Sequence, residues 1–137
     1  MGLPGLATRS AAARLARFKA GRKVVVPIAV EFRHDGATLP PTMPNVMAAR
    51  ARVACTQARG VVRVKGARMV PGFNAEFWNA FAALSGAGQL RCLHRDGLLL
   101  LAVPMTQPSG SGVLVRLRRE DLTILTACLS QGPSRLG

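Results

Sequence analysis

The chain contains very little negative charge. It has 6 Asp and Glu residues against 19 Lys and Arg residues, which gives a formal net charge of +13 and an isoelectric point near 11.8. A compact domain with this balance repels itself, and a polyanion that supplies counter-charge relieves the repulsion. Most of the basic residues are Arg, whose planar fork pairs with phosphate. A GC-rich genome would replace Lys by Arg, but it would not remove acids. We therefore expect a nucleic-acid partner, ahead of an anionic membrane or an acidic protein.

Groups for acid–base chemistry are equally scarce. His34 and His94 are the only histidines, and the carboxylates are spread singly apart from Glu120-Asp121, which suits a helix start. The Walker and dinucleotide-binding patterns are absent. His94-Arg95-Asp96 and Gly110-Ser111-Gly112 lack the surroundings of a kinase loop or a nucleophile elbow. We expect a protein that is not an enzyme and that has no cofactor, metal site or small-molecule substrate.

The chain has no paired cysteine motif and no long apolar run. Cys55, Cys92 and Cys128 are odd in number and far apart, which disfavours a disulfide framework and a zinc site and favours a reducing intracellular compartment. Each lies in an apolar stretch and is predicted to be buried. The longest apolar run, residues 98–105, falls far short of the ~20 residues of a membrane span. The sequence predicts a protein that is not transmembrane.

What is present is enough apolar sequence for one folded domain. Hydrophobic residues make up 49% of the chain and mean hydropathy is +0.22, which excludes a wholly disordered basic tail. At 137 residues, the length suits a single core. We predict a basic N-terminal arm at 1–22, one α+β domain at 23–131 and a loose tail at 132–137.

The arm has two interpretations. It is rich in Arg and contains no acid, and Ser10 is placed to cap a helix over residues 11–20 with Arg14 and Arg17 exposed. This composition is typical of a mitochondrial import signal and also of an arm that threads into RNA. We expect the mitochondrial matrix as the location, with the cytoplasm or a virion as alternatives, and we expect the domain to fold without the arm.

A basic β-ribbon is the most informative pattern. The sequence predicts two strands, residues 46–57 and 61–70, joined near residues 58–60. If Ala58-Arg59 form the loop between them, Cys55 pairs with Val62 and Arg52 pairs with Lys65. Alternation then gathers four cations on one face, with apolar residues on the other. Like charges placed opposite each other are destabilising unless phosphate lies across them. A one-residue slip in register would destroy this face. The four cations are Arg50, Arg52, Arg63 and Lys65.

The clearest helix is predicted over residues 73–85. Asn74 is a good N-cap, Phe73 and Trp78 have hydrophobic-staple spacing, and Gly86 is a natural end. The aromatic residues at helical spacing favour core packing over stacking on bases.

The remaining elements are mostly strands. Residues 23–33 are predicted to form a strand, with Pro27 at an edge or bulge, and residues 37–45 to form a loop. A hairpin is predicted over residues 90–103, with its turn at 95–97. After a loop at 107–112, residues 113–118 are predicted to form a further strand. Residues 122–129 fit either a helix or a last strand. The expected class is α+β, with a small antiparallel sheet or a partly open barrel of OB-type element order.

Together these features predict a non-enzymatic, RNA-binding structural component of a ribonucleoprotein particle, of the ribosomal or mitochondrial-ribosomal type. Its partners would be structured or ribosomal RNA and the neighbouring proteins of the particle. The alternatives are a single-strand-binding module or small viral coat protein, and an assembly factor with an acidic partner. The predicted nucleic-acid-binding residues are Arg9, Arg14, Arg17, Lys19, Arg22, Lys23, Arg50, Arg52, Arg59, Arg63, Lys65, Arg68, Arg116 and Arg118.

Overall fold

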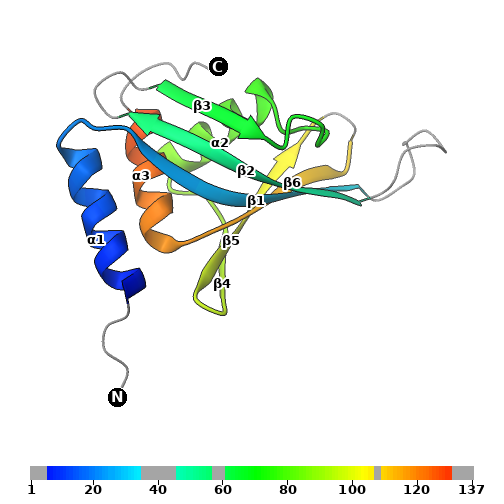
Figure 1. Cartoon of the computed structure of the whole chain (residues 1–137). Coiled ribbons are helices and arrows are strands. Elements are labelled where there is room, and N and C mark those ends of the chain that lie inside the picture. The colour runs from blue at the N-terminus through cyan, green and yellow to red at the C-terminus, as the bar shows by residue number, and fades with distance from the viewer. Residues whose placement is uncertain (1–5, 35–45, 57–60, 107–108, 131–137) are drawn as a thin grey trace.

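A computed structural model describes residues 6–34, 46–56, 61–106 and 109–130 (Figure 1). The predicted loop at 37–45, the Ala58-Arg59 turn and the tail at 132–137 lie outside these residues. The elements are α1 (Leu6–Lys19), β1 (Val24–His34), β2 (Val46–Thr56), β3 (Val61–Gly66), α2 (Ala75–Gly86), β4 (Cys92–Arg95), β5 (Leu98–Met105), β6 (Ser111–Leu117) and α3 (Arg119–Ser130).

The strands form one antiparallel sheet of six strands in the order β3-β2-β1-β6-β5-β4. The predicted α+β class with an antiparallel sheet is confirmed. The sheet is not closed into a barrel, so the OB-type alternative is not confirmed. The reason lies in the connection: the chain leaves β3 through α2 and re-enters the sheet at its opposite edge, so β3 and β4 are separated by the other four strands.

The element order contains two consecutive β-β-β-α units, which share one core. The helix that follows the first three strands, α2, packs on β5, and the helix that follows the second three, α3, packs on β2 and β3. Each helix therefore covers strands of the other unit. A helix and its own three strands would leave apolar surface exposed, so the two halves depend on each other.

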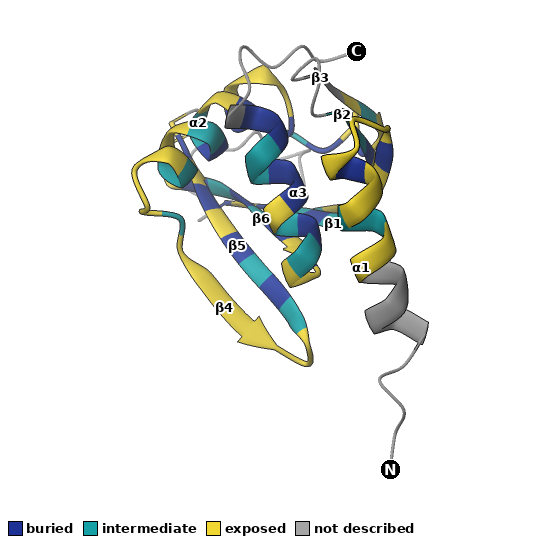
Figure 2. Cartoon of the chain, turned by 90° about the vertical axis from the view of Figure 1, so that its left-hand side faces the viewer, coloured by how far each residue is buried: buried dark blue, intermediate teal, exposed yellow. Residues whose placement is uncertain are grey.

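The core lies between the sheet and the helices on one side of it (Figure 2). Along β1, β5 and β6 every second residue is buried, which is the pattern of a sheet with one covered face. Phe32, Val53 and Val103 of the strands are fully buried beneath Phe81 of α2 and Ile124 of α3. The face of the sheet that alternates with these residues points away from the core.

Helix α1 is part of this body. Phe18 is 1% exposed and belongs to the core, and Arg14 lies in an ion pair with the buried Asp121 of α3, 2.6 Å from Nη2 to Oδ1. The prediction that Arg14 is exposed was wrong, because its guanidinium is needed to compensate that carboxylate. Residues 14–19 also differ from a freely extending arm, since they pack against β1 and α3.

The predicted ribbon register is confirmed. In the structure Cys55 pairs with Val62 and Arg52 pairs with Lys65. The second strand ends earlier than predicted, at Gly66 instead of residue 70. Gly66 has φ +106°, and a Cβ there would lie 2.6 Å from the Arg50 carbonyl oxygen, so the backbone turns at the one residue that tolerates this close approach.

The predicted helix at 73–85 is confirmed as α2. The Asn74 side chain accepts a hydrogen bond from the Phe77 amide at 3.3 Å, and the Phe73 and Trp78 ring centroids are 5.6 Å apart. All six aromatic side chains are buried, which confirms core packing over base stacking.

Three further expectations are settled by tertiary packing. Residues 122–129 lie in the helix α3, because its buried residues Ile124, Leu125, Cys128 and Leu129 have helical spacing and belong to the core. Ser111 and Gly112 belong to β6 and not to a loop, since they pair with β1. Cys55 and Cys128 are buried as predicted, but Cys92 is exposed, because it lies in the short edge strand β4.

Candidate nucleic-acid interface

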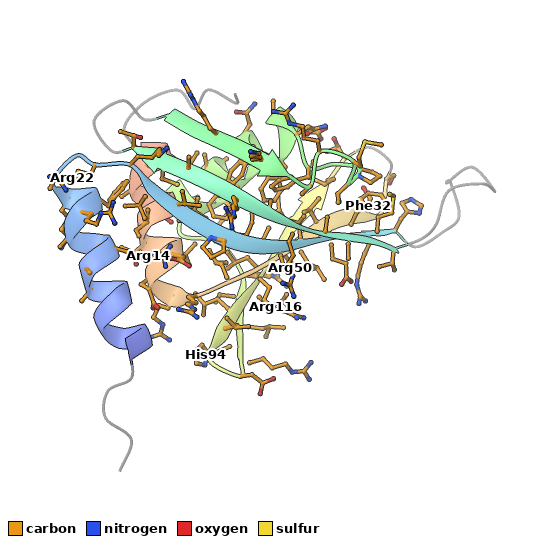
Figure 3. All side chains as sticks on the ribbon, in the orientation of Figure 1. Arg14, Arg22, Phe32, Arg50, His94 and Arg116 are labelled. Carbon is orange, nitrogen blue, oxygen red and sulfur yellow. The ribbon has the colours of Figure 1, made fainter. Side chains whose placement is uncertain are left out.

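The side of the sheet that faces away from α2 and α3 is the candidate site, and we call it the open face. None of the helices or strands that the structure describes covers it (Figures 1 and 3). It is formed by the outward residues of the six strands: Val25, Pro27, Ala29, Glu31, Arg33, Val46, Ala48, Arg50, Arg52, Ala54, Thr56, Arg63, Lys65, Leu93, Arg95, Leu98, Leu100, Ala102, Pro104, Gly112, Leu114 and Arg116.

The open face is strongly positive. Its single acid, Glu31, is hydrogen-bonded to Arg33 two residues along the same strand. Within the described ranges, no acid pairs with the other cations of the face. Those uncompensated cations are Arg50, Arg52, Arg63, Lys65, Arg95 and Arg116, and all are exposed.

Strand pairing sets the spacing of these charges. Arg50 and Arg116 both pair with Ala29, from opposite sides of β1. With strands roughly 4.8 Å apart, their Cα atoms are about 10 Å apart across the small Ala29 side chain. Figure 3 shows the two arginines on the same side of the sheet. The next row places Lys65 beside Arg52, so the cations of β3, β2 and β6 form a band that crosses β1 at Pro27 and Ala29.

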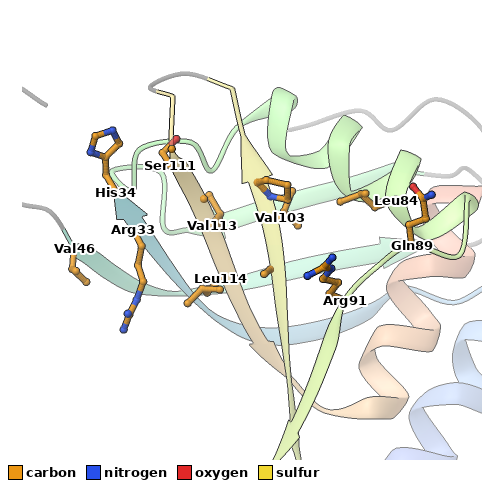
Figure 4. Close-up of a pocket in the computed structure, with 14 residues that line it drawn as sticks. Arg33, His34, Val46, Leu84, Gln89, Arg91, Val103, Ser111, Val113 and Leu114 are labelled. Carbon is orange, nitrogen blue, oxygen red and sulfur yellow. The ribbon is translucent and has the colours of Figure 1, made fainter. Parts of the chain in front are cut away.

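Three adjoining hollows make the open face a trough. The middle hollow has a volume of about 490 Å³ and a floor of Ala29, Ala48, Leu100 and Leu114. Around it lie Arg50, Arg95 and Arg116, together with the Glu31–Arg33 pair. It shares Ala29, Arg50 and Arg116 with a second hollow, which reaches Lys65, Arg118 and Asp121. It shares Arg33 and Leu114 with a third, which extends to Val46 and Arg91 (Figure 4).

The predicted binding residues fall into separate places. Arg50, Arg52, Arg63, Lys65 and Arg116 lie on the open face, and Arg118 lines the adjoining hollow. The other predicted residues that the structure describes lie elsewhere. On α1, Arg14 is paired with Asp121, whereas Arg17 and Lys19 are exposed. Arg22 and Lys23 are exposed between α1 and β1, and Arg68 is exposed in the turn after β3. The side chain of Arg9 and the whole of Arg59 lie outside what the structure describes.

Three cations of the trough were not among the predicted binding residues. Arg33 extends the open face at the end of β1, Arg95 lies on β4, and Arg91 lines the third hollow. Arg33 alternates with the apolar residues of its strand and could have been assigned a face. Its place in the same hollow as Arg50, however, depends on β1 pairing with β2, and the sequence did not specify that pairing.

One end of the trough is bounded by the Arg14–Asp121 ion pair. The Asp121 side chain is fully buried, and the Arg14 guanidinium also donates to the Val25 carbonyl oxygen at 2.9 Å. Burial raises the pKa of the Asp121 carboxyl above its ordinary value, and the Arg14 charge opposes that rise. Because this carboxylate is compensated by Arg14, it does not neutralise the cations of the open face.

The other reactive side chains lie on the helix side. Cys55 of β2 and Cys128 of α3 are buried in the core, and the hydrogen bond between their side chains lowers the pKa of Cys128 to about 7 and raises that of Cys55. Among the described residues, no group of three His, Cys, Asp or Glu side chains is placed to hold a metal ion. No described helix is long and apolar enough to cross a membrane. What the open face offers chemically is an array of donors for anions.

Comparison of the chain with protein-family models, with curated proteins and with solved structures finds no match. The function must therefore be inferred from the open face itself.

Proposed function

We propose that this protein is a non-enzymatic RNA-binding component of a ribonucleoprotein particle and that RNA lies on the open face. The observation that carries the proposal is the set of six exposed cations on one uncovered sheet face without an acid to pair with them. A protein surface in water usually interleaves both signs. A band of one sign is unfavourable for the free protein and becomes favourable against phosphate.

The chemistry of the face supports binding over catalysis. It holds guanidinium and ammonium donors, and its only carboxylate is engaged by Arg33. General acid–base or nucleophilic catalysis needs a free base or an activated nucleophile near the bound substrate. The two carboxylates that line the trough, Glu31 and Asp121, are paired with Arg33 and Arg14, and most of the remaining lining is cationic or apolar.

Within such a particle, we propose a structural role of the ribosomal or mitochondrial-ribosomal kind, with RNA on the open face and neighbouring proteins elsewhere on the surface. A viral coat protein and an assembly factor with an acidic protein partner are the competing functions. A coat protein would form closed shells, visible by electron microscopy. An assembly factor would bind an acidic protein in preference to RNA.

The test is a charge-removal variant of the open face. We expect Arg50→Gln, Arg52→Gln, Arg63→Gln and Lys65→Gln together to weaken RNA binding at low salt. Each phosphate that a cation neutralises adds about 0.7 to the slope of log affinity against log salt for a single strand, so removing up to four cations should flatten that slope by about 2–3. The measurement is fluorescence anisotropy of a labelled RNA of about 15 nucleotides over a salt series.

A matched control separates the face from the net charge. Changing Arg17, Lys19, Arg22 and Arg119 to Gln removes the same number of charges from exposed positions that line none of the three hollows. The sequence predicted that Arg17, Lys19 and Arg22 also contact RNA, and this control tests that prediction. With RNA on the open face, we expect the salt slope of the control to stay close to that of the wild type. If the two variants lose affinity and slope equally, binding is a property of overall charge and the open face is not the contact surface.

A further inference from the structure

The open face carries exposed apolar side chains as well as cations. Of the four large hydrophobic residues that are exposed in the described part of the chain, Val25 (42%), Val46 (49%) and Leu93 (69%) lie on it. The fourth, Met69, lies in the turn after β3 and off the face. The surface that concentrates the positive charge therefore also concentrates the exposed apolar area.

The apolar residues continue across β5 and β6. Leu100 and Leu114 form the floor of the middle hollow, and Leu98 lies beside them, opposite Arg95. The solvated face of an antiparallel sheet is normally polar. Here Thr56 is the only uncharged side chain of the open face with a hydrogen-bonding group.

The partner that fits must offer both negative charge and apolar surface. A second copy of the chain fits poorly, because each copy carries a net charge of +13 with only 6 acids against 19 basic residues. A duplex presents phosphates and grooves outward and keeps the faces of its bases stacked inside. An unpaired strand presents phosphates on one side and base faces on the other.

We infer that the open face binds unpaired RNA, with phosphates on the cation band of β3, β2 and β6. The base faces lie on the apolar side chains of the same face, which are Leu100 and Leu114 and the exposed Val25, Val46 and Leu93. Because all six aromatic side chains are buried, the bases contact aliphatic side chains and the planes of guanidinium groups such as Arg116. This inference names the ligand class of the proposed function and depends on it.

The same residues predict that binding is largely independent of sequence. Adenine edges are read by Asn or Gln and cytosine edges by Asp or Glu. The outward strand residues of the open face include no Asn or Gln, and their one Glu is held by Arg33. Gln89 lines only the third hollow, which contains none of the cation band. On the band itself only the guanine contact of Arg or Lys is available, so we expect U-, A- and C-rich strands to bind within about threefold of one another.

The first experiment uses the full chain and three RNA ligands with equal numbers of phosphates: an unpaired strand, the same strand with abasic sites, and a duplex. At a single low salt concentration, we expect the unpaired strand to bind about tenfold more tightly than each of the others, because only it offers base faces.

The second experiment keeps the charge and changes the apolar surface. The variant combines Val25→Thr, Val46→Thr and Leu93→Thr. It leaves the net charge unchanged, and Thr has a high propensity for β-strands. We expect roughly tenfold weaker binding of the unpaired strand, an unchanged salt slope, and no change for the abasic strand. Met69→Thr, at an exposed apolar position off the face, is the matched control and should bind like the wild type. Circular dichroism checks folding, and Leu93→Thr alone, with a smaller expected loss, is used if the triple variant does not fold.

The outcomes distinguish failure of this inference from failure of the proposed RNA-binding function. If the wild type binds none of the three ligands, the proposed function fails. If the duplex or the abasic strand binds as tightly as the unpaired strand, or if the Thr variant matches Met69→Thr, RNA binding stands and contact with unpaired bases is refuted.

Discussion

At the scale of single residues, Arg14 has a different role from the other cations. Its side chain is 19% exposed, and its guanidinium contacts both the Asp121 carboxylate and the Val25 carbonyl oxygen. Asp121 lies in the first turn of α3, where the helix dipole also favours an anion. A buried carboxylate is strongly destabilising without such compensation. Arg14 is therefore a structural residue, although in the sequence it resembles its neighbours Arg9 and Arg17.

We expect Arg14→Gln to lower the free energy of unfolding by about 3 kcal/mol at pH 7, because it leaves the buried Asp121 charge unpaired. The loss should depend on pH. A raised carboxyl pKa means that the folded state holds the proton more tightly than the unfolded chain. Stability then falls as pH rises from the ordinary carboxyl range through the raised pKa. Without Arg14 the pKa rises further, so the difference from the wild type should be small in acid and grow toward neutrality.

Denaturant unfolding followed by the fluorescence of Trp78, which is 2% exposed, measures this effect. The control is the double variant Arg14→Gln, Asp121→Asn, which removes the charge that would be stranded. It should recover part of the lost stability and lose the extra pH dependence. A stability loss that is equal at pH 4 and pH 7 would refute the role of Arg14 as a charge partner.

At the scale of elements, α1 is the part whose role was predicted least well from the sequence. Its Arg-rich composition indicated a detachable arm, whereas Phe18 completes the core and the helix packs on β1 and α3. The large hydrophobic residues of α1 are few, so composition favoured the charged interpretation. Only the position of the buried Asp121 and of the core surface beside it explains why this helix docks.

We expect deletion of residues 1–19 to lower the free energy of unfolding by more than about 3 kcal/mol, since loss of a fully buried Phe alone has about that effect. Phe18→Ala should reproduce much of this loss. The same Trp78 unfolding measurement applies. Arg17→Gln with Lys19→Gln alters only exposed positions of the same helix and should change stability little. A truncated chain as stable as the full one would show that α1 is separable after all.

The ribbon of β2 and β3 was predictable because its evidence is local. Alternation of Arg and Val, with a short connection, fixes both the register and the face of each side chain. The helix α2 was predictable for a similar reason: Asn74 and the aromatic stripe are signals within one stretch of chain. For residues 122–129 the apolar pattern was too short to distinguish the periodicity of a helix from that of a strand. Packing against the sheet favoured the helix.

At the scale of the whole molecule, charge and stability oppose each other. A net charge of +13 on a chain of 137 residues favours expansion, and the open face concentrates that repulsion. Salt screens charges at the surface and affects buried pairs much less. The same ions that stabilise the free protein should therefore weaken its binding to RNA.

We expect the melting temperature of the free protein to rise by a few degrees as salt increases from roughly 50 to 500 mM, in contrast to the fall in RNA affinity. Circular dichroism at a fixed scan rate measures it. The variant with Gln at Arg50, Arg52, Arg63 and Lys65 should melt higher at low salt and respond less to added salt. A melting temperature that falls with salt would show that surface attractions outweigh repulsion.

The sequence by itself determined the excess of positive charge, the α+β class, the ribbon register and the aromatic core, because each depends on composition or on residues close together in the chain. Tertiary structure alone decided which cations share a face. The pairing of β1 with both β2 and β6 brings Arg50 and Arg116 to either side of Ala29, and the docking of α1 places Arg14 in an ion pair with Asp121. These contacts join residues far apart in sequence, and local patterns do not specify such pairings.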